Sequence, residues 1–431
     1  MFNTNSGIRF FSLYYGLLGN YSCKVLMVGG GTGGCCLASK LTRIIKKPQL
    51  ILLEPSPDHF YQGWFTLCGA GIKRMKDTSK PTAEVLPKNV IWIQDEVTEF
   101  LPDKNAVVTC KGDEIEYDIL VIAVGLKLCF DKIKGLTDAL EHYYNVGSIY
   151  SKHYAEKTYH ALEKFRGGNL IFTFPHGLIK CAGAPLKICL LMEDILRIKG
   201  LRNKANIFYN TPFPKIFAVK HYEGTLVNIC KKREINVNVL TKLIEVRPER
   251  NEAVFTHVRT NAPFIQRYSI LHVTPPMQPP DAITTCKSLV NKFGYVEVDK
   301  YTMQHVRYPN IFAFGDCSNT PNAKTAAACA AQAPIVYKNI QSVLSGQKCK
   351  ARYNGYASCP IVTGVGKCVL AEFDYSFCPL ETFPFSQNCE SKIMYFMKKE
   401  VIPFLYWNVM LKGFWNGPHF IRKLLHLGFS D

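Results

Sequence analysis

The stretch K-V-L-M-V-G-G-G-T-G-G at residues 24–34 decides the fold of this 431-residue chain. Its first five residues have the continuous apolar pattern of a buried parallel strand. Gly29, Gly31 and Gly34 then match the spacing G-x-G-x-x-G, which lets the backbone turn tightly and approach a pyrophosphate. We expect a helix over about 35–45, whose N-terminus would face that pyrophosphate.

A second apolar run, Q-L-I-L-L at residues 49–53, predicts the next strand and ends at Glu54. Glu54 follows the last glycine by about 20 residues, the usual distance for a carboxylate that binds a ribose. A strand, a glycine turn, a helix, a strand and an acid in this order predict an α/β fold with a Rossmann-like dinucleotide-binding domain.

Two later stretches point to a flavin. The strand Y-D-I-L-V-I-A-V-G at 117–125 ends at Gly125 and resembles the second signature of flavoproteins with two dinucleotide domains. The stretch N-I-F-A-F-G-D at 310–316 resembles their third signature, in which the aspartate, here Asp316 after Gly315, holds the ribityl chain. A turn or N-cap residue is the alternative for Asp316. With the glycine loop, these stretches predict FAD as the cofactor.

The sequence K-T-A-A-A at 324–328 predicts the start of another helix. Its free N–H groups and Lys324 would stabilise negative charge on the reduced flavin ring, and Thr325 belongs to the same cofactor-binding stretch. Pro334 falls inside this helical stretch, so we expect it to kink the helix or end it early.

The chain has 17 cysteines but no C-x-x-C pair, which argues against a metal site. The chain is also too long to be a small disulfide scaffold, so most of these thiols are expected to be reduced and buried. Cys35 and Cys36 lie at the start of the first helix, where thiol pKa values are lowered, but we prefer a packing role. Cys129 is likewise interpreted as structural, the alternative being a third redox cysteine.

Cys181 and Cys359 carry the most chemical information. Cys181 comes between a predicted strand at 169–175 and a predicted helix at 184–198, where a pyridine-nucleotide enzyme would have a second glycine-rich loop. The helix dipole and two nearby lysines, Lys180 and Lys187, would stabilise a thiolate there. A thiol in place of a phosphate loop suggests that electrons arrive from a sulfur compound. Only folding could bring Cys359 near it, and either cysteine alone could be core filler.

The chain resembles a known family, the sulfide:quinone oxidoreductases, specifically the eukaryotic mitochondrial type. The resemblance covers almost the whole chain from residue 25 on. Seven stretches carry it: H-F-Y-Q at 59–62, K-C-A-G-A-P at 180–185, F-G-D-C at 314–317, K-T-A-A-A at 324–328, G-Y-A-S-C-P at 355–360, A-E-F-D-Y at 371–375 and P-F-L-Y-W-N at 403–408.

The resemblance implies that Cys181 and Cys359 are the redox pair and that FAD is bound by Gly33, Gly34, Glu54, Gln62, Val97, Asp316 and Lys324. It also implies the substrate and partners: hydrogen sulfide as reductant, ubiquinone as electron acceptor, and glutathione or sulfite as acceptor of the sulfane sulfur. Gly63 and the loop at 176–177 depart from the family pattern.

The chain becomes basic and aromatic from Ser391 onward. The pattern predicts two short apolar helices, separated at Gly413 and at 417–418, that lie in a membrane interface rather than crossing it. Packing on the body or a dimer contact is the alternative. The residues expected to enter the membrane surface are Phe404, Leu405, Trp407, Phe414, Trp415 and Phe420.

The composition of the chain narrows its expected partners and its expected location in the cell. The net charge is +18, but no nucleic-acid-binding motif is present, so we expect no nucleic-acid partner. The first acidic residue is Glu54, and an N-terminus without acids fits a mitochondrial presequence at 1–21, although a frayed end fits as well. The expected location is the inner mitochondrial membrane, as a monotopic protein.

The expected organisation is an FAD-binding domain at 22–145 and 285–350, a second Rossmann-like domain at 146–284, and a C-terminal region at 351–431. Two other functions remain open from the residues alone. One is a type II quinone reductase or disulfide reductase that uses NAD(P)H, and the other is a flavin-binding protein without turnover.

Overall fold

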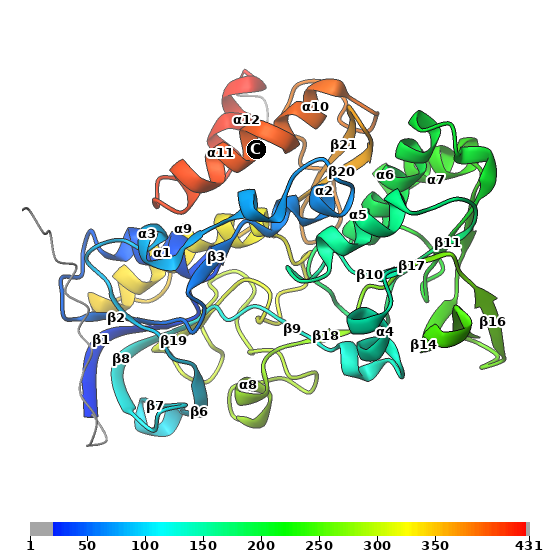
Figure 1. Cartoon of the computed structure of the whole chain (residues 1–431). Helices are drawn as coiled ribbons and strands as arrows, with labels where there is room; N and C mark the ends of the chain where they lie inside the picture. Colours follow the sequence, from blue (N-terminus) through cyan, green and yellow to red (C-terminus); the bar gives the residue numbers. More distant parts are fainter. Residues whose placement is uncertain (1–19, 428–431) are drawn as a thin grey trace, which may run out of the picture.

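The computed structural model describes residues 20–427, so the predicted presequence at 1–21 lies almost entirely outside the described residues. The two largest sheets of the described chain, one mixed and one wholly parallel, have helices around them, and the helices of the C-terminal region lie together at the top of the view in Figure 1.

The first sheet is built around β1 (Asn20–Val28), which pairs in parallel with β2 (Leu50–Leu53) and with β8 (Glu114–Ile122). On one side β5 (Ile91–Ile93) follows β2, and on the other β7 (Ala106–Thr109) and β6 (Val97–Leu101) continue as antiparallel strands. A late segment, β19 (Ile311–Ala313), pairs in parallel with β8. Two stretches far apart in the sequence therefore share one sheet.

The helix after β1 differs from its expected range. Helix α1 (Thr32–Leu41) begins three residues before the expected start and ends before residue 45. Gly33 and Gly34 are poor helix formers, so propensity alone placed the start too late. They are nevertheless buried within the first turn of α1, where tertiary packing outweighs propensity.

Helix α9 (Ala326–Leu344) begins where expected, with Thr325 as its N-cap. The expectation that Pro334 ends this helix early is wrong, because the helix continues for ten residues beyond it, to Leu344. Pro334 removes one backbone N–H donor, but it lies in a buried stretch packed in the core that α9 shares with α1, and this packing holds the helix together.

The second sheet is wholly parallel, in the order β10 (Val146–Gly147), β17 (Ile270–His272), β11 (Gly168–Thr173), β12 (Ala205–Asn210) and β13 (Ile235–Asn238). Helix α6 (Ala184–Ile198) follows β11 and confirms the range expected from the sequence. Helices α5 (Ala155–Glu163) and α7 (Lys220–Lys232) and the antiparallel strands β14 (Thr241–Arg247), β15 (Glu252–His257) and β16 (Pro263–Arg267) complete this half. The two sheets agree with the expected division of the chain, whose boundaries stay a prediction.

The C-terminal region begins with a hairpin, β20 (Ala357–Gly364) and β21 (Lys367–Phe373), and β20 packs on α6. A helical stretch then runs through α10 (Lys392–Phe396), a π-helical turn at 397–401, α11 (Ile402–Leu405) and a second π-helical turn at 406–410. After a break, α12 (His419–Leu425) ends the described chain. The prediction of two short helices is confirmed, and no helix within 20–427 combines the length and the apolar character needed to cross a membrane.

Candidate active site

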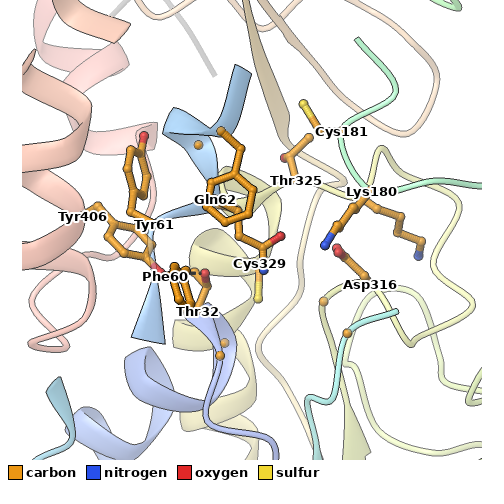
Figure 2. A pocket seen from close by; sticks show the side chains of 18 of the residues that line it. Thr32, Phe60, Tyr61, Gln62, Lys180, Cys181, Asp316, Thr325, Cys329 and Tyr406 are labelled. Atoms are coloured by element: carbon orange, nitrogen blue, oxygen red, sulfur yellow. Dashed lines mark hydrogen bonds between the residues drawn. The ribbon is translucent and has the colours of Figure 1, made fainter. Parts of the chain in front are cut away.

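A cavity of about 440 Å³ lies where the first sheet, the second sheet and the C-terminal region meet. Figure 2 shows its wall, with side chains from the glycine loop, the segment at 60–62, the Cys181 loop and Tyr406 turned toward one space. Ten of the predicted cofactor-binding residues line it: Gly29, Gly31, Gly33, Glu54, Gln62, Gly125, Gly315, Asp316, Lys324 and Thr325.

Two predicted cofactor contacts do not line this cavity. Gly34 packs against the Gly29 backbone, so a Cβ at 34 would lie only 1.9 Å from the Gly29 carbonyl oxygen. Val97 lies on β6 in a core cluster with Phe100 and Ile115. Gly34 therefore determines the path of the loop backbone but does not line the cavity. The predicted contact of Val97 with FAD stays a prediction.

The glycine loop forms a cradle that fits a dinucleotide. Gly29 has φ +103° and approaches the Ala123 carbonyl so closely that a Cβ would lie 2.5 Å from its oxygen. Gly31 is the N-cap of α1, has no side-chain cap, and has open space where a Cβ would stand. The first N–H groups of α1 are therefore free to bind a pyrophosphate.

Glu54 lies at the other wall of this cradle. Its Oε2 accepts from the Gly30 N–H at 2.7 Å, and its Oε1 accepts from the Ser56 N–H at 2.8 Å. Burial raises the pKa of Glu54, and both hydrogen bonds counter that rise. A carboxylate fixed beside the glycine loop in this way has the position expected of a ribose ligand.

The start of α9 forms the opposite end of the cavity. The Thr325 hydroxyl caps the helix by accepting from the Ala328 N–H at 3.1 Å, while Ala326 and Ala327 line the cavity with their neighbours. A 19-residue helix therefore points its N-terminus at this space. Such an end stabilises negative charge, as the sequence predicts for this stretch.

Lys324 lines the cavity and also has a structural role that the sequence did not predict. Its Nζ donates to the carbonyl oxygens of Ser318 at 2.7 Å and Thr320 at 3.0 Å, so the amine is already used to hold the loop after β19. Burial lowers the pKa of Lys324 to about 8. Lys180 and Asp316 lie side by side in Figure 2, and burial raises the pKa of Asp316 while both lysines lower it. Lys180 therefore helps Lys324 to stabilise the negative charge of Asp316.

Folding brings Cys181 and Cys359 together. Cys181 has φ +51°, its N–H donates to the Lys324 carbonyl at 2.7 Å, and its carbonyl accepts from the Tyr150 hydroxyl at 3.1 Å. Cys359 is buried on β20, with its Sγ 2.6 Å from where a Gly183 Cβ would stand. Both are free thiols, both line the cavity, and the Cys359 thiol hydrogen-bonds to Cys181.

The two thiols differ in charge. The pKa of Cys181 is held well below its ordinary value by the hydrogen bond from Cys359 and, against the effect of burial, by Lys187, whose Nζ lies 3.3 Å from the Cys181 Sγ. The hydrogen bond to Cys181 and burial raise the pKa of Cys359 well above its ordinary value. Of the two sulfurs, Cys181 beside Lys187 is therefore the one that favours the thiolate form.

Sequence reasoning missed Lys398. This lysine comes from the π-helical turn at 397–401, is buried, and donates from its Nζ to the Gly63 carbonyl at 2.7 Å. Burial lowers its pKa to about 8, and the repulsion of Lys187 adds to that. It lies among other lysines in a basic helix, so nothing in the local sequence marked it as a cavity residue.

Several secondary expectations also have outcomes. The expected lowering of thiol pKa values at the start of α1 is wrong: burial raises the pKa of Cys36 to about 12 and raises that of Cys35 well above its ordinary value. Their buried packing agrees with the preferred interpretation. Cys129 is buried outside the cavity wall. A Cβ at Gly63 would lie 2.5 Å from the Tyr61 ring, so glycine there suits the local packing.

The start of α6 does not resemble a phosphate loop. The preceding loop places Gly177 at φ +98° in open space and stacks His176 on Phe213, with ring centroids 6.0 Å apart. At the helix N-terminus itself, the Cys359 Sγ lies against Gly183. The Cys359 sulfur therefore lies at the helix start, where a nucleotide phosphate would otherwise approach.

The known proteins that are similar to this chain agree with this interpretation of the site. No family model matches the chain. The mitochondrial sulfide:quinone oxidoreductase of Mus musculus is 47% identical over 408 residues, which cover 94% of this chain and 90% of that protein. The mitochondrial sulfide:quinone oxidoreductase of Dictyostelium discoideum is 42% identical over 398 residues, covering 92% of this chain and 87% of that protein.

Among solved structures, the sulfide:quinone oxidoreductase of Aquifex aeolicus superposes with a TM-score of 0.78 over 95% of this chain and 96% of that one. Its sequence identity of 21% supports the shared fold alone. The identities of the two mitochondrial relatives, over nearly the full length of each chain, place this chain in the sulfide:quinone oxidoreductase family.

Proposed function

We propose that this protein oxidises hydrogen sulfide through the Cys181–Cys359 pair and FAD, and passes the two electrons to ubiquinone. The observation that carries the proposal is the meeting of the two thiols, one of them a thiolate beside Lys187, at the wall of the cavity that the glycine cradle also lines. Family membership supports the same reaction.

The chemistry of the pair follows from its asymmetry. In the oxidised form the two sulfurs are joined, directly or through a bridging sulfur. Hydrosulfide attacks the Cys359 sulfur, an S–S bond forms there, and the bond to Cys181 breaks so that Cys181 leaves as a thiolate. A leaving thiol of low pKa speeds this exchange, and Lys187 is one of the groups that lower the pKa of Cys181.

The product at Cys359 is a persulfide, which gives its outer sulfur to glutathione or sulfite. The remaining two thiols close again to a disulfide, which releases two electrons and two protons. FAD, when bound, accepts these electrons and delivers them to the quinone. The residues that would hold it are the glycine cradle, Glu54, Asp316 and the start of α9.

Contact with a membrane surface follows from the C-terminal helices. Phe404, Phe414 and Phe420 are 62%, 66% and 75% exposed, while Leu405, Trp407 and Trp415 are half-buried. Ile402 from the same helical stretch lines the cavity, so a lipid-soluble quinone could reach it from this side. The mitochondrial relatives support the mitochondrion as its location, and we propose the inner membrane as the surface that these helices contact.

One experiment tests the reaction directly. The purified protein, loaded with FAD and kept anaerobic, receives sulfide while the flavin spectrum is followed, and decylubiquinone is added afterwards. We expect sulfide to bleach the flavin and the quinone to restore it. Bleaching by NADH with none by sulfide would favour the NAD(P)H-dependent alternative instead.

A further inference from the structure

We propose that Tyr406 is a positioning residue that holds the glycine loop in the shape that receives FAD, so that docking of the C-terminal segment and cofactor binding depend on each other. The proposal rests on the FAD binding proposed above. Tyr406 begins the π-helical turn at 406–410, whereas the loop lies near the start of the described chain.

A chain of hydrogen bonds joins these two regions. The Tyr406 hydroxyl lies 2.7 Å from Nε2 of His59 and 2.9 Å from Oγ1 of Thr32. The other ring nitrogen of His59, Nδ1, lies 3.1 Å from the Gly30 carbonyl oxygen. One hydroxyl from the C-terminal region is therefore bonded, directly or through His59, to the residues on both sides of Gly31.

The direction of each hydrogen bond can be assigned. Burial lowers the pKa of His59 to about 4, so the ring is neutral and carries one proton. The Gly30 carbonyl can only accept, so that proton is on Nδ1 and Nε2 must accept from Tyr406. The Thr32 hydroxyl then donates to the Tyr406 oxygen. Removing the Tyr406 hydroxyl leaves two buried or half-buried groups of the loop region without this partner.

A second set of contacts holds the C-terminal end of α1, the helix that begins at Thr32. The Ser39 hydroxyl donates to the Leu411 carbonyl at 2.6 Å, and Lys40 Nζ donates to the Gly413 carbonyl at 3.0 Å and to Asn416 Oδ1 at 2.8 Å. Gly413 approaches α1 so closely that a Cβ would lie 3.0 Å from Ser39. Residues 406–416 therefore clamp α1 at both ends, and α1 presents the N–H groups of the cradle.

The first test compares Tyr406→Phe with the wild type. Each protein is stripped of FAD, and the affinity for added FAD is measured by quenching of flavin fluorescence. We expect Tyr406→Phe to bind FAD about tenfold more weakly. The matched control is Tyr222→Phe, which loses a buried hydroxyl bonded to the Glu372 carbonyl at 3.2 Å, far from the glycine loop, and should keep wild-type affinity.

A second variant keeps the proposal testable if Tyr406→Phe does not fold. Gly413→Ala should push the clamp away from α1 and weaken FAD binding several-fold. Its control is Gly346→Ala, because Gly346 has a similar φ of +68° but open space around a Cβ. Unchanged FAD affinity in the folded Tyr406→Phe protein, or equal affinity in the two glycine variants, overturns the inference. A wild-type protein that binds no FAD would instead contradict the proposed function.

Discussion

Each of the two large sheets of this protein has a strand that leads through a loop into a helix whose start lies at the cavity. The chemistry that we propose at the two helix starts is different. In the first sheet β1 leads through a glycine loop into α1, and Gly31 at the helix start faces open space. In the second sheet β11 leads through the Cys181 loop into α6, and Gly183 at the helix start meets the Cys359 sulfur. A helix N-terminus stabilises an anion that reaches it, which we propose is a cofactor phosphate at α1 and the thiolate of Cys181, partner of Cys359, at α6.

The two helix starts differ in the segment of the C-terminal region that packs against each of them. At α1 the C-terminal segment holds the loop through Tyr406, which also lines the cavity, and the space beside Gly31 stays open for a ligand. At α6 the hairpin of β20 and β21 brings its own sulfur to the helix start. The position of one hairpin thus separates a nucleotide site from a thiol site.

The largest effect should come from the sulfurs. Cys181→Ser or Cys359→Ser should lower sulfide-dependent quinone reduction by at least about a thousandfold, because either change removes the disulfide, while FAD stays bound. Steady-state reduction of decylubiquinone and the flavin spectrum measure the two properties. Cys378→Ser, at an exposed thiol, is the control. Normal turnover in either variant of the pair would contradict its redox role.

The next effect concerns the cradle. Gly34→Ala should destabilise the apoprotein by about 3 kcal/mol, because its Cβ would overlap the Gly29 carbonyl oxygen at 1.9 Å. Gly31→Ala has space for its methyl group, so the apoprotein should keep its stability while FAD affinity falls. Denaturant unfolding of the apoproteins and FAD titration separate the two. Equal stability of both apoproteins would show that the close approach at Gly34 is not required.

A smaller effect should appear in the pH dependence of Cys181. The pKa of Cys181 is lowered, so its thiolate persists as the pH falls below the range of an ordinary thiol. Lys187→Met should raise that pKa, so alkylation of the reduced protein by iodoacetamide should slow most below pH 8. Mass spectrometry of the modified Cys181 gives the rate at each pH.

The control for that series is Lys199→Met, at the exposed end of the same helix. It should leave the alkylation profile unchanged. A profile for Lys187→Met that coincides with the wild type would mean that Lys187 does not lower the pKa of Cys181.

The smallest effect is expected in the loop that departs from the family pattern. Gly177→Ala should cost about 1 kcal/mol of stability, since φ is +98° there, and should not change sulfide oxidation because a Cβ meets nothing within 4 Å. Thermal unfolding and quinone reduction measure both. A large loss of activity would indicate that this loop contacts a substrate after all.

Local patterns were enough for the elements that bound the site. The apolar run before Gly29, the helix at 184–198 and the break between the C-terminal helices follow from residue order, because strand burial, helix capping and glycine breaks are local effects. The same reasoning failed at Pro334 and at Cys35. In both places burial in the tertiary fold outweighed a local rule, so the helix continued and the thiol pKa rose.

The sequence by itself determined two nucleotide-like halves, a glycine cradle, and the candidate cysteines with their family. Only the tertiary structure decided that Cys359 meets Cys181, that Lys398 reaches the cavity, and that Tyr406 supports the loop around Gly31. The reason is physical. Turns, strands and helix ends depend on neighbouring residues, whereas a pKa or a hydrogen bond between distant segments depends on distances that exist only once the chain is folded.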